Sequence, residues 1–427
     1  MTQPLNRPQT FLHGPSLGVH AVGWVMMGTL LTGGCSQWLT SDGFTGGTLD
    51  AGEDAVVDAE MDTAVEAAPD ASSDVNVEAS PDVAQDGARD AIAEPCSTTD
   101  LDCDGDALNG CETDTLTSTL HCGRCGHDCF GGACVDGACR PVALAIGQDD
   151  PYGIALDRQQ GRLYWANAGS GEVAAIAVDG GTVEVIAEQQ PGPRSVRALQ
   201  GVAYWSNVGT AAGQGRIMRL DTTVANATPE ALVEGLTNPT ALTLASGKVF
   251  WTNVVSQTGS IMSVPMSGGP TEVVAPNLNM PGGITGDDGG VYWTVVLTGT
   301  VMGLDVLQDP PSVVTLASAL EQPAGVAADT LNVYWTTIGG RVQKISKLPQ
   351  QPVVDLADAQ DMPSGLVVDG SHVYWTNFNG GQVMRLAKTG GPPEAIASAQ
   401  ASPFDLVDDD TSLYWVNRGG SVMRLAK

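Results

Sequence analysis

From about residue 141 to the end of the chain, short apolar runs recur between polar turns and glycine- or proline-rich breaks. The segment from Pro363 to Ala399 shows this unit most clearly. Its runs predict strands at 366–368, 373–376, 382–386 and 394–397. The third run alternates polar and apolar residues, as a half-buried strand does. Four short strands in one unit predict a single blade of a β-propeller.

Seven copies of this unit follow one another, and each contains one aromatic-tryptophan pair. The pairs are Tyr164-Trp165, Tyr204-Trp205, Phe250-Trp251, Tyr292-Trp293, Tyr334-Trp335, Tyr374-Trp375 and Tyr414-Trp415. Successive tryptophans are 40, 46, 42, 42, 40 and 40 residues apart, a period typical of propellers. We expect a tryptophan at one fixed place in each blade to fill the space between neighbouring sheets. A ring of ligand-binding aromatic side chains is the alternative.

A proline precedes the tryptophan in every copy, by fourteen residues in the first and by twelve in the others. These prolines are Pro151, Pro193, Pro239, Pro281, Pro323, Pro363 and Pro403. Because proline cannot donate to a sheet ladder, we expect it where one blade ends and the next begins. An asparagine stands two residues after the tryptophan in five copies, namely Asn167, Asn207, Asn253, Asn377 and Asn417. Val295 and Thr337 replace it in copies four and five, and we expect the asparagine to shape a turn.

The seventh copy ends at Lys427, after its third strand. The run from Pro141 to Ala145 lies before the first copy and matches the apolar ending of the other blades. A strand from this run would complete the last blade and close the ring. The sequence therefore predicts an all-β fold: a seven-bladed β-propeller of four-stranded blades, over residues 141–427, closed by an N-terminal strand.

The motif Tyr-Trp-Thr-Asn, best written at Tyr374 to Asn377, resembles the YWTD repeat of the low-density-lipoprotein-receptor class of propellers. The resemblance covers about residues 141–427. It implies a propeller that binds other proteins, although propellers of that class usually have six blades. Similar repeats also occur in bacterial surface proteins of unknown role.

The first 35 residues have the pattern of an export signal. Residues 21–31 form an apolar run that is too short to span a bilayer. The sequence Leu31-Thr-Gly-Gly-Cys35 follows and resembles a bacterial lipoprotein box, which implies that Cys35 receives lipid. The alternative is an ordinary cleaved signal that leaves Cys35 as an odd thiol, because the other eight of the nine cysteines form a separate cluster.

Residues 36–95 are predicted to be a disordered linker rich in Asp and Ala. An acidic residue occupies every fourth position from Asp50 to Glu94. Like charges four residues apart repel on a helix, and Pro69 and Pro81 interrupt the run. We expect an extended tether that contributes much of the net charge of −30. This charge argues against nucleic acid or an anionic surface as the partner.

Residues 96–140 form a cysteine-rich module. Its eight cysteines are Cys96, Cys103, Cys111, Cys122, Cys125, Cys129, Cys134 and Cys139. In an exported chain this even count predicts four disulfides in a segment too small to bury a large core, and the sequence leaves their pairing open. The pair Cys122 and Cys125 with the flanking His121 and His127 could instead bind zinc, which the oxidising compartment disfavours.

Carboxylates alternate inside this module before a glycine, in a pattern that can surround a calcium ion with oxygen atoms. The predicted metal ligands are Asp100, Asp102, Asp104, Asp106, Asn109 and Glu112. The segment resembles the Asp-rich calcium repeats of thrombospondin type 3 and dockerin modules. The module as a whole is similar to a cysteine-rich repeat of surface proteins in gliding soil bacteria. An acidic turn shaped by Cys103 and Cys111 is the alternative to calcium.

Motifs for catalysis are sparse. His372 is the only histidine of the predicted propeller, which argues against a histidine-based lyase. Asp157, Asp287, Asp329, Asp369 and Asp408 recur at the end of the first strand of their blades. This recurrence favours a turn role over a lactonase-type calcium funnel. No catalytic residue is assigned, and an enzyme is the less favoured prediction.

The sequence thus predicts a lipid-anchored protein of the bacterial cell envelope, on the outer membrane or the cell surface, whose propeller binds a protein or carbohydrate. The membrane contact would be the lipid alone. A funnel enzyme of lactonase or lyase type and a purely structural envelope or matrix component are the alternatives. The insertions at 209–215 and 254–259 are candidates for a contact surface, because loops on a rigid scaffold commonly hold function.

Overall fold

The computed structural model describes residues 96–106, 110–255, 258–308 and 310–427. The predicted export signal with Cys35, the acidic linker and the predicted metal ligand Asn109 lie outside the described residues. Among the described residues, all regular secondary structure is β-strand, and no helix is long and apolar enough to cross a bilayer.

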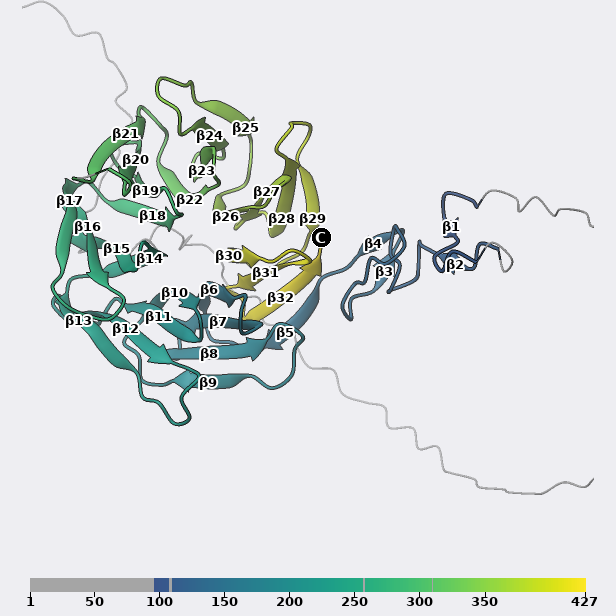
Figure 1. The fold of residues 1–427 in the computed structure, drawn as a ribbon, viewed down its shortest axis with the longest axis horizontal. Helices are drawn as coiled ribbons and strands as arrows, with labels where there is room; N and C mark the ends of the chain where they lie inside the picture. Colours follow the sequence, from purple (N-terminus) through teal and green to yellow (C-terminus); the bar gives the residue numbers. More distant parts are fainter. Residues whose placement is uncertain (1–95, 107–109, 256–257, 309) are drawn as a thin grey trace, which may run out of the picture. The chain divides into compact units, whose positions relative to one another are not determined.

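Seven four-stranded antiparallel sheets form the blades of a propeller, as predicted, and the sheets follow one another around a central axis (Figure 1). Blade 1 contains β6 (Pro151–Asp157), β7 (Arg162–Asn167), β8 (Glu172–Ala177) and β9 (Glu184–Ala187). Blade 2 contains β10 (Pro193–Leu199), β11 (Val202–Asn207), β12 (Gly215–Asp221) and β13 (Glu230–Leu236). Blade 3 contains β14 (Pro239–Ala245), β15 (Lys248–Val255), β16 (Thr258–Pro265) and β17 (Glu272–Leu278).

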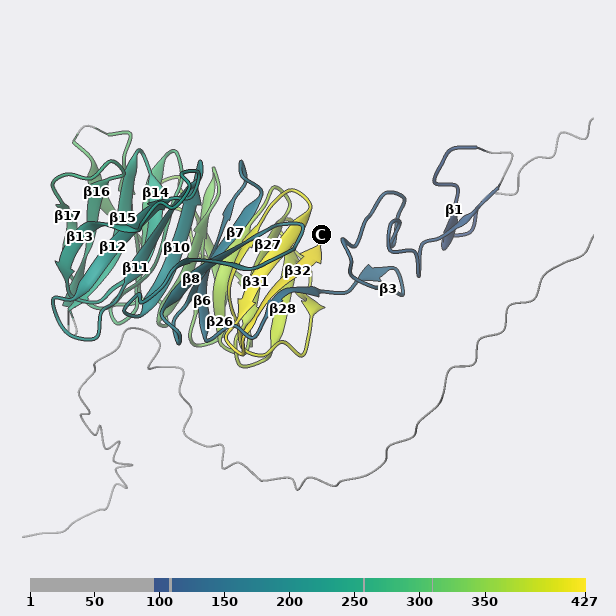
Figure 2. The ribbon, with the colours of Figure 1, turned by 90° about the horizontal axis from the view of Figure 1, so that it is seen from below.

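The remaining blades follow the same order, and the side view shows their strands running between the two ends of the ring (Figure 2). Blade 4 contains β18 (Pro281–Gly286), β19 (Gly290–Val295), β20 (Thr300–Asp305) and β21 (Ser312–Ala317). Blade 5 contains β22 (Pro323–Ala328), β23 (Asn332–Thr337), β24 (Val342–Ser346) and β25 (Val354–Ala357). Blade 6 contains β26 (Pro363–Val368), β27 (His372–Asn377), β28 (Gln382–Ala387) and β29 (Glu394–Ala397). Blade 7 contains β30 (Pro403–Asp408), β31 (Ser412–Asn417), β32 (Ser421–Ala426) and β5 (Val142–Ile146).

Strand β5 confirms the predicted closure of the ring. It pairs antiparallel with β32, with Ser421 opposite Ile146 and Arg424 opposite Val142. The N-terminal end of the propeller therefore supplies the outer strand that the C-terminal blade lacks. The hydrogen bonds between β5 and β32 join the two ends of the chain segment and leave no unpaired edge on the third strand.

The aromatic pairs fill the seams between blades, as predicted. Successive side chains of a strand point to opposite faces of the sheet, so the two rings of a pair enter different seams. Each seam buries the tyrosine or phenylalanine of one blade with the tryptophan of the next: Tyr164 with Trp205, Tyr204 with Trp251, Phe250 with Trp293, Tyr292 with Trp335, Tyr334 with Trp375, Tyr374 with Trp415, and Tyr414 with Trp165. All seven indoles are 0% exposed, so they are core and not a ligand-binding ring.

The regular spacing of proline also has a local cause. Every one of the seven prolines begins the innermost strand of its blade, where its missing N–H leaves no gap in a ladder. The residue before each proline has a left-handed backbone, for example Met280 at φ 64° and Met362 at φ 58°. A register shift follows directly in every innermost strand, as between Pro403 and Leu406. This bulge re-aims the side chains that face the axis.

The asparagine after the tryptophan does not shape a turn, so that prediction was wrong. Asn207 is the last residue of β11, is 1% exposed, and donates from Nδ2 to Gln190 Oε1 over 2.8 Å. The indole of Trp205 donates to the same oxygen over 3.0 Å. Gln148, Gln360 and Gln400 play the same part in blades 1, 6 and 7. In these four blades the asparagine therefore helps to satisfy a glutamine that holds the buried indole, whereas blade 3 has Leu236 at the glutamine position and its Trp251 Nε1 has no partner.

The hydroxyl residue that directly follows the tryptophan links adjacent blades. Thr336 Oγ1 accepts the Gly325 N–H over 3.0 Å and lies 3.1 Å from the Ser364 carbonyl of the next blade, to which it donates. Ser206, Thr294 and Thr376 make the equivalent bonds in blades 2, 4 and 6. Ala166 and Val416 occupy this position in blades 1 and 7, and neither can form the link.

The cysteine-rich segment forms two short hairpins, β1 (Asp100–Leu101) with β2 (Thr113–Asp114) and β3 (Cys134–Val135) with β4 (Ala138–Cys139). Its eight cysteines form four disulfides, as predicted. They pair Cys96 with Cys111, Cys103 with Cys125, Cys122 with Cys134, and Cys129 with Cys139. These cross-links stabilise a segment that has only four two-residue strands.

Candidate functional site

A cavity of about 440 Å³ runs along the axis of the propeller. The innermost strands β6, β10, β14, β18, β22, β26 and β30 surround this axis (Figure 1). The lining of the cavity follows β26 along its whole length, from Met362, before the proline, to Val368, the last residue of the strand. We call the end at which these strands begin the proline end, and the opposite end, where the aspartate turns lie, the aspartate end.

The second residue after the proline is small in six of the seven blades. The seven residues at this position are Gly153, Ser195, Ala241, Gly283, Gly325, Gly365 and Asp405. A Cβ added at Gly365 would lie 2.4 Å from the Phe404 carbonyl oxygen, and one at Gly325 would lie 2.2 Å from that of Ser364. Neighbouring innermost strands thus approach too closely for a side chain at these glycines. Asp405 is the single charged exception.

Asp405 bridges the seam between blades 7 and 1. Its Oδ2 accepts the Ile154 N–H over 3.1 Å, in the way that Ser195 Oγ accepts the Leu242 N–H of the next blade. Val416 cannot make the hydroxyl link at this seam, so the carboxylate supplies an inter-blade bond in its place. Burial raises the pKa of the Asp405 carboxyl, and the nearby charge of Arg197 opposes that increase.

Aromatic and cationic side chains gather at the proline end on blades 6, 7, 1 and 2. The ring centroids of Tyr152 and Phe404 are 4.3 Å apart, and Phe378 meets Phe404 edge-on at 6.0 Å. The guanidinium carbon of Arg194 lies 4.5 Å from the Tyr152 centroid, and that of Arg418 lies 5.1 Å from it. Tyr152 therefore has a guanidinium contact from each neighbouring blade.

These two arginines differ in their partners. Arg418 forms a bidentate ion pair with Asp150, with distances of 2.6 Å from Nε to Oδ1 and 2.7 Å from Nη2 to Oδ2. This pairing raises the pKa of Arg418 against the opposing effect of burial. Among the described residues no carboxylate forms an ion pair with Arg194, and its buried Nη1 has no hydrogen-bond partner. Arg194 is thus a partly buried cation without a counter-ion in the described part of the chain.

The opposite side of the proline end is apolar. Blades 4, 5 and 6 contribute Met280, Val296, Leu297, Ile338 and Met362 to the lining. These residues either precede the proline or follow the strand that carries the aromatic pair, so the fold brings them to one end of the channel. The cavity opening therefore has an apolar half and a cationic-aromatic half.

The recurring aspartates shape turns at the other end. In Asp329, Oδ1 accepts the N–H groups of Leu331 and Asn332, each over 2.8 Å. Asp157, Asp287, Asp369 and Asp409 accept pairs of N–H groups in the same way. The equivalent residue of blade 7 is thus Asp409, and the inclusion of Asp408 in this set was wrong. Asp408 lies one position earlier and pairs with Lys427 over 2.5 Å.

A second cavity, of about 710 Å³, lies at the aspartate end between blades 5, 6 and 7. Lysines from the next blade neutralise its carboxylates: Lys388 lies 2.6 Å from Asp329, and Lys427 lies 3.1 Å from Asp369. Burial opposes ionisation of Asp329, but hydrogen bonds from Lys388 and the turn outweigh it and lower the Asp329 pKa to about 2. These charges have partners within the fold, so we assign them a structural role.

Three of the predicted calcium ligands lie together in the cysteine-rich segment. Oxygen atoms of Asp102, Asp104 and Glu112 lie within 4.8 Å of one another. Each also accepts a backbone N–H: Asp102 from Gly105, Asp104 from Asp106, and Glu112 from Cys103. Asp100 and Asp106 are not part of this group, and Asp100 Oδ2 accepts the Ser97 hydroxyl. Calcium binding here stays a prediction.

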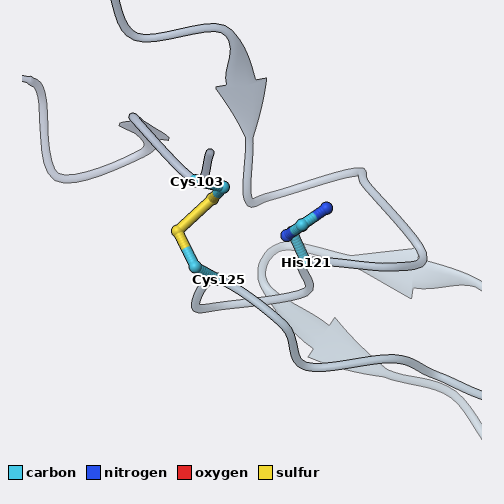
Figure 3. Close-up of side chains that lie close together, drawn as sticks. All are labelled: Cys103, His121 and Cys125. Atoms are coloured by element: carbon cyan, nitrogen blue, oxygen red, sulfur yellow. A yellow bond between two sulfur atoms is a disulfide. The ribbon is translucent and has the colours of Figure 1, made fainter. Parts of the chain in front are cut away.

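The histidines near the cysteines do not form a zinc site in this arrangement. Figure 3 shows His121 beside the disulfide that joins Cys103 and Cys125. Both sulfur atoms are used by that bond, and His121 Nδ1 accepts the Gly126 N–H over 3.0 Å. His127 Nδ1 lies 2.6 Å from the Cys122 carbonyl oxygen, a contact within the backbone turn. The disulfide interpretation of these cysteines therefore holds.

The two predicted contact loops lie at the proline end. The segment 209–215 follows Asn207, which pairs with Pro193 at the start of the innermost strand. In blade 3 the insertion extends the hairpin of β15 and β16, whose last paired residues are Val255 and Thr258. Residues 256–257 lie outside the described part of the chain. Both insertions therefore belong to the end that has the apolar and cationic halves.

Sequence reasoning missed Arg194, Arg197 and Asp405. They stand one, four and two residues after the proline of their blades, where the other copies mostly have small or neutral residues. Aligning the seven copies on this proline would have shown them as departures from the repeat. His372, the histidine of the propeller, begins β27 at the aspartate end and contacts Ser371 Oγ through Nδ1 over 2.7 Å.

Comparisons with known proteins support the fold and do not assign a family. A family described as "Outer membrane protein assembly factor BamB" matches residues 142–270, less than half of the chain. Virginiamycin B lyase from Staphylococcus aureus is similar in structure, with 14% identity, a TM-score of 0.57, and coverage of 67% of this chain and 99% of that one. A streptogramin B lyase structure has 13% identity, a TM-score of 0.56, and coverage of 67% and 96%. A comparison with curated protein sequences finds no significant match.

Likeness at this level of identity shows the propeller fold alone. The resemblance to YWTD repeats of the receptor class stays a prediction.

Proposed function

We propose that this protein is a ligand-binding propeller whose binding site is the proline end of the central channel. The observation that carries the proposal is the cavity of about 440 Å³ with a one-sided cluster of aromatic and arginine side chains. Such a volume falls in the range of small-molecule sites, and polar groups placed on an apolar lining are typical of them. A protein or carbohydrate partner could insert a chain end here and contact the two loops as well.

The cellular setting is part of the same proposal. Lipid on Cys35 would anchor the protein to the bacterial cell envelope, and the acidic linker would hold the propeller away from the membrane. Calcium at Asp102, Asp104 and Glu112 would brace the cysteine-rich module. Replacing Cys35 by serine should abolish incorporation of labelled palmitate and release the full chain from the membrane fraction. Membrane retention without label would contradict the anchor.

Channel chemistry favours binding over catalysis. The described lining of the channel contains no histidine, whereas the similar virginiamycin B lyase is catalytically inactive when one of its histidines is replaced by alanine. One observation favours an enzyme as the second candidate: burial raises the pKa of Asp405, and perturbed carboxyls are common at catalytic sites. Asp405 would then serve as an acid or base in a hydrolase or lyase reaction.

Blocking the channel tests the binding proposal. Ala324 lies in the lining on blade 5, and an Ala324→Phe variant should fill the proline end without touching a charged group. We expect a thermal-shift screen of neutral, cationic and anionic small molecules, glycans and peptides to yield ligands of the full chain. The variant should lose them. If no compound binds the native chain, or if binding survives the substitution, the proposed site is wrong and a structural role is favoured.

A further inference from the structure

We infer that the proline end recognises an amphipathic carboxylate, with its carboxylate at Arg194 and its apolar body against blades 4, 5 and 6. The inference rests on the proposed function and specifies the ligand class of the same site. It depends on the contrast between the two halves of the cavity opening. It also depends on the missing counter-ion of one arginine.

The arginines near the channel differ in their negatively charged partners. Asp150 neutralises Arg418 through two hydrogen bonds, and the charge of Arg197 acts on the Asp405 carboxylate without a direct ion pair. Arg194 has no such partner among the described residues, and one of its guanidinium nitrogens is buried without a hydrogen bond. A partly desolvated guanidinium is stabilised by a carboxylate, which matches its donor geometry. An anionic ligand would supply this group.

The position of Arg194 favours a ligand over a structural anion. Its side chain lines the cavity, and the Tyr152 ring lies 4.5 Å from its guanidinium carbon. The ring limits the directions in which the guanidinium can turn, because the guanidinium lies over the aromatic face. The guanidinium group of Arg194 is therefore held at the proline end before a ligand arrives. Such preorganisation lowers the entropy lost on binding.

The apolar half defines the rest of the ligand. Met280, Leu297, Ile338 and Met362 line the cavity across from the arginine. Two of them are methionines, whose flexible side chains adapt to ligands of varied shape. Burial of an alkyl or aromatic group there contributes roughly 25 cal/mol for each Å² removed from water. A purely polar anion would leave this surface without a partner.

The ligand should have a single charge. Of the two arginines beside Tyr152, only Arg194 lacks a counter-ion within the described residues, and the chain as a whole has a formal charge of −30. A polyanion such as a nucleotide or nucleic acid would meet repulsion from this field. A monocarboxylate matches the one guanidinium and carries the least charge into the channel. Fatty acids and the C-termini of apolar peptides share this chemistry.

Isothermal titration calorimetry of the full chain tests the inference with paired probes. N-acetyl-leucyl-phenylalanine is compared with its C-terminal amide, and decanoate with decanol. We expect each acid to bind at least tenfold more tightly than its neutral counterpart, a difference of about 1.4 kcal/mol. The better of the two acids identifies the source as peptide or fatty acid, and either result supports the inference.

Variants of the arginine complete the test. Arg194→Gln should remove the preference for the acid. Arg194→Lys should keep part of it, because lysine retains the positive charge but lacks the paired N–H donors of the guanidinium. Arg216→Gln is the matched control, since Arg216 forms an exposed ion pair with Glu234 on β12 and β13. Thermal melting of each variant establishes that the fold is retained. A control variant that behaves like Arg194→Gln would overturn the inference.

The outcomes separate this inference from the proposed function. Equal binding of acid and neutral probes, or binding of neutral glycans alone, overturns the carboxylate and leaves the channel as a binding site. Blockage of those ligands by Ala324→Phe would still support the channel. Absence of binding by every compound in the screen overturns both.

Discussion

The glutamine that holds a buried indole gives the sharpest test of how the repeat works. Gln190 Oε1 accepts hydrogen bonds from Trp205 Nε1 and Asn207 Nδ2, over 3.0 and 2.8 Å. Both donors belong to side chains that are at most 1% exposed. Gln190→Leu would leave the two donors without a partner. Each unsatisfied buried donor costs about 1–3 kcal/mol, so we expect the variant, with two such donors, to lose about 2–6 kcal/mol of unfolding free energy.

Blade 4 of the same chain contains the compensating change, whereas blade 3 keeps Asn253 together with Leu236 and leaves Trp251 Nε1 without a partner. In blade 4 the equivalent residues are Leu278 and Val295, and the Trp293 Nε1 has no partner. Adding Asn207→Val to Gln190→Leu should therefore reproduce a pair that the fold already accepts. The double variant should cost about 1–3 kcal/mol, less than Gln190→Leu alone, because only the indole donor stays unsatisfied. The double variant should therefore cost less than the two single changes together, by at least about 1 kcal/mol.

Urea denaturation of the full chain, followed by tryptophan fluorescence and circular dichroism, gives the four free energies of this cycle. Gln159→Leu is the control, because Gln159 is exposed in a turn and should change stability by less than about 0.5 kcal/mol. A Gln190→Leu variant as stable as the control would refute the reasoning. So would a double variant that costs the sum of the two single changes.

Three further predictions follow from the charges and disulfides. Asp405→Asn should keep the bond to the Ile154 N–H and the native melting temperature. If an activity is found, the variant should abolish turnover. Unchanged turnover would exclude a catalytic role for Asp405. The Asp329 pKa of about 2 lies below the ordinary value of 3.8, so its pairing stabilises the fold above about pH 4 and the contribution is lost as the pH falls through 2. Asp329→Asn should reduce the loss of melting temperature between pH 4 and pH 2, and an unchanged acid profile would contradict the assignment. Reduction of the disulfides should unfold the segment 96–139 and leave the melting transition of the propeller unchanged, because all nine cysteines precede residue 140. Loss of the propeller transition on reduction would show that the propeller depends on the disulfides.

Features that every blade needs were readable from the sequence. The seven aromatic pairs predicted seven blades, because a tryptophan at one fixed place in each blade fills the space between neighbouring sheets. The seventh copy ends after its third strand, and every blade has four. The apolar run near Val142 was therefore predicted to supply the closing strand. The roles of Asn207 and Gln190 were not visible, because their contact joins residues 17 positions apart through a side-chain geometry that local turn rules do not describe.

The candidate site was harder to predict because a site consists of departures from the repeat. Arg194 and Asp405 occupy different blades, 211 positions apart in the chain, and only ring closure brings both to the channel. Asp408 shows the converse error: one residue of misalignment placed an ion-paired side chain among the turn aspartates. Small residues stand beside the axis because neighbouring innermost strands lie close together. A larger residue such as Asp405 is recognised as an exception only once this closeness is known.

The most direct measurement of the central claim is a crystal structure of the full chain grown with N-acetyl-leucyl-phenylalanine or decanoate, whichever binds more tightly. The account predicts ligand density in the axial cavity at the proline end, with the carboxylate in hydrogen-bond contact with Arg194 and the apolar part against Met280 and Met362. A ligand bound at the aspartate end or on the outer strands, with the proline end empty, would contradict it.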